Sequence, residues 1–300
     1  MQKFLEKYLL PIAMFLGIAF HKHLSVFSPF LPLLLAIMLF ISYCRIGIND
    51  VKLTKFHYIL LAIQYIGSAV IYIALRPVNE ILAQAVMICV LTATATSAPV
   101  VAGLLGGSIS VTAAYSIISN LSVALIAPLF LSIVGGTPES FNLISSFWHI
   151  FISVIPILVV PFLLALLLQK SAPVIHRRIQ KAQIVSFYIW AAALTIVIGN
   201  VTQYVQLQDD GNYTLEVVIA VASMITCLLQ FYFGRLIGKK FGRVVAGGQG
   251  LGQKNTVLAI WLTQTYLNPL ATLGPGTYVL WQNIVNSWQI WRHARLKDKK

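Results

Sequence analysis

The sequence predicts an all-α membrane protein with ten transmembrane helices, from its composition, its long charge-free runs and the distribution of its basic residues. Of 300 residues, 58% are hydrophobic and only 10% are charged, whereas soluble proteins carry about 25% charged residues. Too few polar side chains remain to cover a water-soluble core. This composition excludes a soluble enzyme, a disordered chain and a disulfide-stapled secreted domain, and it argues against a nucleic-acid-binding protein.

Charge-free runs delimit the spans, because an ionised side chain at mid-bilayer costs about 2.5–3.5 kcal/mol on insertion scales. Their lengths fit the roughly 20 residues that a membrane-spanning helix needs. The predicted spans cover residues 5–20, 27–44, 56–75, 80–106, 109–134, 145–169, 183–206, 214–236, 241–266 and 270–294.

Basic residues are distributed very unequally between the two predicted sides of the membrane. Ten spans place both termini on one side, and that side holds eighteen of the 21 Lys and Arg residues. The opposite side holds only Lys22 and Arg76, together with the acids Glu80, Glu139, Asp209, Asp210 and Glu216. Because cytoplasmic loops are enriched in Lys and Arg, both termini are predicted to be cytoplasmic.

The two halves of the chain share a pattern that indicates an inverted repeat. Gln64 precedes an aromatic residue inside the third predicted span, and Gln230 does so inside the eighth. Five helices followed by five more must have opposite orientations, because five is odd. We therefore predict two inverted repeats, residues 1–139 with helices 1–5 and residues 140–300 with helices 6–10, as in many secondary transporters.

The fourth and ninth spans are each predicted to break. Residues 92–99 are rich in Thr and Ser and end at Pro99, which lacks the amide hydrogen that a helix requires. In the ninth span the predicted interruption covers residues 247–256, where four glycines between positions 247 and 252 are a poor composition for a continuous helix. Two broken helices at corresponding positions predict a ligand site at the midplane. A pair of kinked packing helices is the simpler alternative.

The sequence resembles the bile acid:sodium symporter superfamily over nearly the whole chain, as a divergent prokaryotic-type member. A family stretch in the fourth helix, Gly-Thr-Ala-Ser-Asn, is matched by Ala-Thr-Ser-Ala-Pro at residues 95–99. A ninth-helix stretch, Gly-Met-Gln-Asn-Ser-Gly-Leu, is matched by Gly-Gln-Lys-Asn-Thr-Val-Leu at 252–258. A tenth-helix Trp-His-Asn motif is matched by Trp-Gln-Asn at 281–283.

The resemblance implies a core domain of helices 3–5 and 8–10 beside a panel domain of helices 1, 2, 6 and 7. The fourth and ninth helices would cross at the substrate site. The implied substrate contacts lie in the two breaks and the tenth helix: Thr96, Ser97, Pro99, Lys254, Asn255, Thr256, Gln282 and Asn283. The positions implied for the two sodium sites are Gln64, Ser116, Asn120, Gln249, Gln253 and Lys254.

The largest departure from the family pattern is at the ion sites. The acid that the family shares between both sodium ions corresponds to Gln249 or Gly250, and no acid occurs between Glu216 and Asp298. Lys254 replaces the motif Gln, and its ammonium has three donors and no acceptor. We hypothesise that this ammonium occupies the position of a sodium ion, holds the crossover together and attracts an anion. Burial favours a neutral lysine, so proton coupling and uncoupled transport both stay open.

The sequence thus predicts a sodium-independent secondary transporter for an organic anion, a sterol conjugate or a small carboxylate, working by alternating access. The alternatives are a sodium-coupled symporter with residual ligands and, in another class, a channel or sensory membrane protein. An enzyme is not expected, because the span interiors contain no Asp or Glu and no His pair at helical spacing. No catalytic residue, metal or cofactor is predicted.

The expected partners follow from the same reasoning. They are a small organic anion and membrane lipid, with protons as an optional coupling ion, sodium doubtful and no nucleic acid. The expected location is the plasma membrane, which is the inner membrane in a bacterium.

Overall fold

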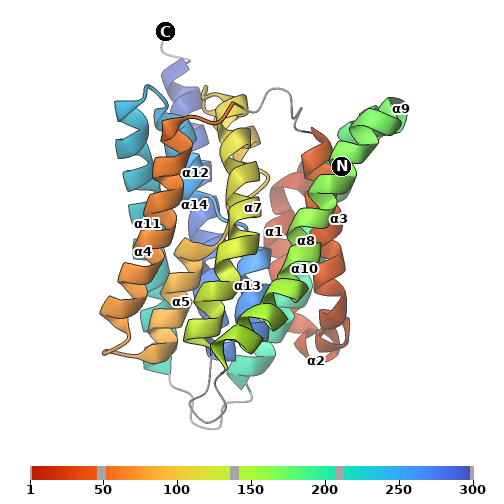
Figure 1. Ribbon diagram of the computed structural model, residues 1–300. Coiled ribbons are helices and arrows are strands. Elements are labelled where there is room, and N and C mark those ends of the chain that lie inside the picture. Colours follow the sequence, from red (N-terminus) through yellow and green to blue (C-terminus); the bar gives the residue numbers. More distant parts are fainter. Residues whose placement is uncertain (1, 46–51, 136–141, 207–212, 298–300) are drawn as a thin grey trace.

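Helices account for all the regular secondary structure in the residues that the computed structural model describes, which are 2–45, 52–135, 142–206 and 213–297 (Figure 1). The prediction of an all-α protein is confirmed. Six of the described helices are long and apolar enough to cross a membrane: His21–Arg45, Lys55–Leu75, Ile109–Val134, Leu143–Ser171, Ile184–Tyr204 and Tyr213–Lys240. The chain is therefore a multi-pass membrane protein. The predicted repeat boundary at 139–140, with Glu139, Asp209 and Asp210, lies outside the described residues.

The elements follow one another along the chain with short connections. They are α1 (Gln2–Ala19), α2 (His21–Leu24), η1 (Ser25–Phe30), α3 (Leu31–Arg45), α4 (Lys55–Leu75), α5 (Glu80–Leu91), α6 (Ala98–Leu104), α7 (Ile109–Val134), α8 (Leu143–Ser171), α9 (Pro173–Lys181), α10 (Gln183–Gln206), α11 (Tyr213–Lys240), α12 (Val244–Gly252), α13 (Thr256–Tyr266), η3 (Pro269–Thr272) and α14 (Leu273–Lys297). The basic helix α9, which starts at Pro173, was not among the predicted elements.

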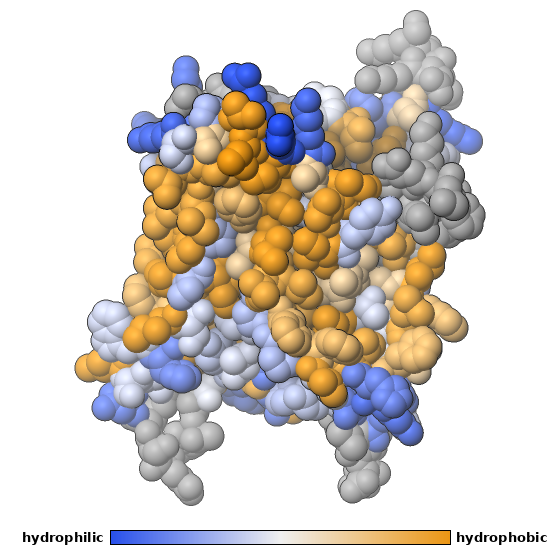
Figure 2. Space-filling model, turned by 90° about the vertical axis from the view of Figure 1, so that its right-hand side faces the viewer, coloured by the Kyte–Doolittle hydropathy of each residue, from blue (hydrophilic) through white to orange (hydrophobic). Residues whose placement is uncertain are grey.

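Two groups of helices stand side by side in Figure 1. In one group, α1 packs on α10, and α3 packs on both α8 and α10. In the other, α5 contacts α4, α11 and α14, and α12 contacts α11 and α7. The groups meet where α7 contacts α8 and where α13 contacts α3 and α10. A broad apolar band crosses the middle of the face shown in Figure 2, with hydrophilic residues at both ends, as a bilayer requires.

The fourth span breaks where its sequence predicts. α5 ends at Leu91, and Thr92 leaves the helix with extended backbone angles. α6 begins at Ala98, with Pro99 in its first turn, where a missing amide hydrogen has no cost. The break is therefore confined to residues 92–97.

The ninth span breaks inside the predicted stretch 247–256, but its glycines do not form the break. α12 continues through Gly252, and the interruption covers residues 253–255. The physical reason is close helix packing. A Cβ atom built at Gly247 would lie 2.1 Å from the carbonyl oxygen of Gly234 on α11. Small residues let neighbouring backbones approach closely in a membrane, and here that contact outweighs the poor helix propensity of glycine.

Candidate functional site

The two breaks cross and pair with each other through their backbones. Thr94 and Lys254 form an isolated antiparallel bridge. The amide of Ala95 donates to the carbonyl of Gln253 at 2.9 Å, and the amide of Asn255 donates to the carbonyl of Ala93 at 2.8 Å. Unwound backbone deep in a membrane protein must find partners inside the protein. Each break supplies them for the other.

The ammonium of Lys254 lies at the end of α5. Its Nζ donates to the carbonyl oxygens of Val90 at 2.8 Å and Thr92 at 3.0 Å. The last carbonyls of a helix lack intrahelical partners and carry partial negative charge. The residue is 1% exposed. In the part of the chain that the structure describes, the one ion pair is Arg76–Glu80, so no carboxylate accompanies this ammonium.

Gln64 of α4 covers the same helix end from another side. Its Nε2 donates to the carbonyl oxygens of Leu91 at 2.7 Å and Thr92 at 3.3 Å. Its Oε1 accepts from the hydroxyls of Tyr115 at 2.9 Å and Ser119 at 3.3 Å. Gln64 and Lys254 therefore share the carbonyl oxygen of Thr92 at the start of the break.

Ser116 and Asn120 of α7 contact the far side of the first break. Asn120 Nδ2 donates to the carbonyl oxygens of Thr94 at 3.1 Å and Ser116 at 2.7 Å. Ser116 Oγ makes long contacts, 3.4 Å each, with the carbonyls of Thr94 and Ala95. Asn120 Oδ1 is buried and has no hydrogen-bond partner. This pair therefore retains a free acceptor oxygen.

Gln249 and Gln253 do not share this arrangement. Gln249 Nε2 donates to Asn286 Oδ1 at 2.9 Å on α14, away from the break. Gln253 Nε2 donates to Ser97 Oγ at 2.8 Å. At Gly250, the other position implied for the family acid, an added Cβ would lie 2.8 Å from Cδ1 of Tyr115. The ring of Tyr115 fills the space that an acidic side chain would need.

A cavity of about 360 Å³ lies beside the crossover, between α3, α10 and the two breaks. It brings together seven of the eight predicted substrate contacts: Thr96, Ser97, Lys254, Asn255, Thr256, Gln282 and Asn283. Pro99 is buried in α6 and is not in the lining. Gln282 Oε1 accepts from the Lys254 amide at 2.8 Å, so the tenth predicted helix is tied to the crossover.

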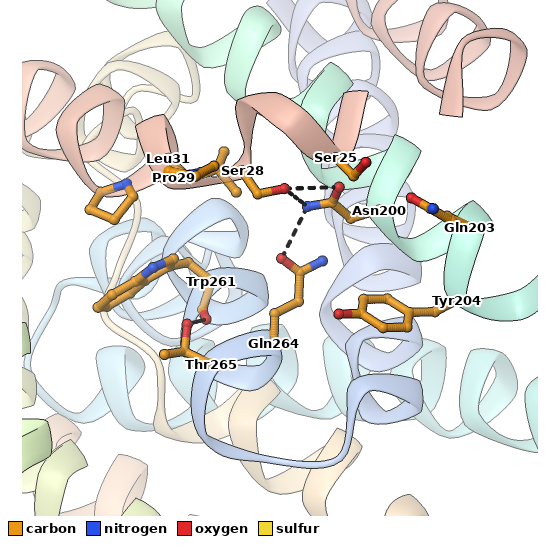
Figure 3. Close-up of a pocket in the computed structure, with 11 residues that line it drawn as sticks. Ser25, Ser28, Pro29, Leu31, Asn200, Gln203, Tyr204, Trp261, Gln264 and Thr265 are labelled. Carbon is orange, nitrogen blue, oxygen red and sulfur yellow. Dashed lines mark hydrogen bonds between the residues drawn. The ribbon is translucent and has the colours of Figure 1, made fainter. Parts of the chain in front are cut away.

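A second cavity, of about 530 Å³, lies along the opposite halves of the same helices (Figure 3). Its lining comes from η1 and the start of α3, the end of α10, and the second half of α13. Asn200 Nδ2 donates to Ser28 Oγ at 2.8 Å and to Gln264 Oε1 at 3.4 Å. Along α10, the fully buried Leu194 and Val197 separate the two linings. Both cavities thus lie along the interface between α3, α10 and α13, and the packed side chains of Leu194 and Val197 lie between them.

Sequence reasoning missed several residues that hold the site. Tyr115 and Ser119 were not predicted, although Ser119 lies within one turn of Ser116 on α7. Tyr278 of α14 donates to the carbonyl of Gly252 at 2.8 Å and accepts from Gln230 Nε2 at 2.9 Å. Arg45, assigned only to orientation, lines the first cavity. The available signal was the Gln–aromatic match between the halves, which points to Gln230.

No protein-family model matches the chain, and no curated protein matches it. The resemblance to the bile acid:sodium symporter superfamily therefore stays a prediction that depends on the motifs. Among the described residues there is also no group of three or more His, Cys, Asp or Glu side chains that would hold a metal ion.

Proposed function

We propose that this protein is a secondary transporter that carries a small organic anion by alternating access without sodium, using the Lys254 ammonium as a built-in cation. The observation that carries the proposal is the contact of Lys254 Nζ with the carbonyl oxygens of Val90 and Thr92, at 2.8 and 3.0 Å. A sodium ion needs oxygens of this kind. A tethered ammonium supplies the same charge without leaving the protein.

The covalent attachment of this ammonium has a consequence for energy coupling. A bound sodium ion links solute movement to a gradient, because it enters and leaves with the solute. The Lys254 side chain stays in the protein, so it stabilises the crossover in every state of the cycle. We therefore expect a uniporter or a proton-coupled carrier, in which no sodium ion moves.

Matched side-chain pairs support the proposed inverted repeats. Gln64 on α4 pairs with Tyr115 on α7, and Gln230 on α11 pairs with Tyr278 on α14. The two breaks, α5–α6 and α12–α13, meet at the Thr94–Lys254 bridge. Corresponding elements would pair in this way around a pseudo-two-fold axis in the membrane plane.

Ten spans follow if short pieces are counted with their neighbours. The proposed spans are α1, α2 with η1 and α3, α4, α5 with α6, α7, α8, α10, α11, α12 with α13, and α14. In this scheme α1, α3, α8 and α10 form the panel, and the other spans form the core. The end of α14 and α9 lie at one end of the molecule (Figure 1). We propose that this basic end faces the cytoplasm of a plasma membrane.

The two cavities support alternating access. Both lie between the proposed panel and the crossover, one along Leu35–Arg45 of α3 and the other around Ser28 and Leu31. A small rotation of one domain against the other would open one cavity, while the packed side chains around Leu194 and Val197 keep the other closed. A channel would instead need a continuous path past Leu194 and Val197, which are both fully buried.

Counterflow is the first expected result. Vesicles containing purified protein and loaded with unlabelled cholate or benzoate should accumulate the labelled form of that anion transiently above equilibrium, with saturable rates. A carrier must return loaded to exchange its solute, which gives this overshoot, whereas a channel gives none. The measurement is radiolabel uptake over time against empty vesicles. Ohmic current without overshoot would support the channel alternative.

A sodium-coupled symporter is the second candidate, and one observation favours it. Asn120 Oδ1 is buried without a hydrogen-bond partner, and Ser116 Oγ makes only long contacts of 3.4 Å. These oxygens and the carbonyls of Thr94 and Ala95 are the type of ligand that binds sodium. No acid is near them in the described residues, and the +1 charge of Lys254 opposes a second cation in the same crossover.

A further inference from the structure

The first cavity contains one cation that is free to meet a ligand. Arg45 and Lys254 are the charged residues in its described lining, which includes no Asp or Glu. The Lys254 ammonium already donates to two carbonyl oxygens. Arg45 ends α3, is exposed, and has no hydrogen bond or ion pair in the described part of the chain. The guanidinium of Arg45 is thus the remaining positive group for a ligand in this cavity.

The side chains of α3 that line this cavity change from apolar to charged along the helix. Leu35, Met38, Leu39, Ser42 and Arg45 line the cavity in that order. Their positions follow the pattern i, i+3, i+4, i+7 and i+10, which places them on one side of the helix. The deep part of this stripe is therefore apolar, and its end at the cavity mouth is cationic.

The rest of the cavity lining is also apolar on one side and polar on the other. Phe187 and Trp190 of α10 add aromatic surface, whereas Ser97, Asn255 and Asn283 add hydroxyl and amide groups on the crossover side. A volume of about 360 Å³ falls in the range of roughly 300–1,000 Å³ that suits small organic molecules. The lining therefore suits an elongated amphipathic solute with one charged end.

We infer that Arg45 is the residue that binds the charged group of the proposed organic anion in this cavity. That group pairs with Arg45 at the mouth, and the apolar body of the solute lies along α3 and α10. Arginine suits this role because its planar fork binds two oxygens of a carboxylate or sulfonate at once. The inference rests on the proposed transport function and identifies the anion-binding residue of its site.

The test compares acids with their neutral esters. Saturable binding of radiolabelled cholate, benzoate and their methyl esters is measured on protein in lipid nanodiscs, with empty nanodiscs subtracted. One lost charge-assisted hydrogen-bond pair corresponds to about a tenfold change in affinity. Arg45→Gln should therefore weaken acid binding about tenfold and leave ester binding unchanged. Arg45→Lys should lose less, because it keeps the charge without the fork.

Arg178→Gln is the matched control. Arg178 is an exposed basic residue on α9 that does not line the cavity, so its replacement should change neither acid nor ester binding. An unchanged acid-to-ester ratio in Arg45→Gln, with counterflow intact, overturns the inference and leaves the proposed function standing. Equal loss of acid and ester binding also overturns it, because that result shows a structural role. No saturable binding or counterflow of either anion by the wild type contradicts the proposed function itself.

Discussion

The Lys254→Met variant is expected to lose transport and about 2–5 kcal/mol of stability. Methionine has a similar length but no donor, so the carbonyl oxygens of Val90 and Thr92 lose the ammonium that they share. An unsatisfied buried polar group costs about 1–3 kcal/mol. Gln64 still donates to Thr92 O at 3.3 Å and covers part of this loss. Thermal unfolding in detergent and counterflow in vesicles measure the two effects.

A control separates this effect from loss of charge alone. Lys240→Met removes an exposed lysine at the end of α11 and should leave both stability and transport near wild type. If Lys254→Met unfolds at the same temperature as Lys240→Met and transports normally, the ammonium does not hold the crossover together. The site assignment would then be wrong.

The second large effect is expected from Gly234→Ala. The added Cβ would lie 2.2 Å from the carbonyl oxygen of Gly247 and 3.1 Å from Cα of Gly248. These are backbone atoms, so α12 must move away from α11, and the second break moves with it. Overpacking of this kind costs about 1–3 kcal/mol, and the better helix propensity of alanine returns less than about 1 kcal/mol. We expect lower thermal stability and reduced transport.

Gly67→Ala is the matched control for this substitution. Its Cβ would meet only Cγ1 of Val90, at 3.7 Å, which is ordinary van der Waals contact. Helix α4 should therefore gain up to about 1 kcal/mol from the better propensity of alanine. Equal stability of Gly234→Ala and Gly67→Ala would show that α11 and α12 are not held at the observed separation by glycine.

The helices were predictable because their signal is chemical and local. Charge-free runs give spans close to the observed helices, for example 109–134 for α7 (Ile109–Val134). Pro99 also indicates the break, since proline is favoured in the first turn of a helix and α6 begins there. The glycines at 247–252 were misleading, because glycine serves both to break helices and to bring them together. Only the neighbouring Gly234 on α11 decides between these roles.

The candidate site was predictable in part. The sequence indicates where the two breaks lie, and Thr96 and Asn255 line the same cavity because each lies in one of these breaks. The direction of the Lys254 ammonium could not be predicted from the sequence, since it depends on the carbonyl groups at the end of α5. Gln249 contacts α14 and not the first break, because it lies on α12 one helical turn before the second break. The place of Arg45 in the cavity was not predicted, because the distribution of basic residues explains this arginine by membrane orientation alone.

The central claim, that Lys254 takes the place of a coupling sodium ion, is tested most directly by the sodium dependence of uptake. Initial rates of labelled anion uptake into wild-type proteoliposomes are measured with external sodium varied against choline at constant ionic strength. We expect the same rate at every sodium concentration, because the Lys254 side chain is tethered to the protein and takes the position of the ion. A rate that rises with sodium and saturates would contradict the account and favour a symporter that uses Ser116 and Asn120.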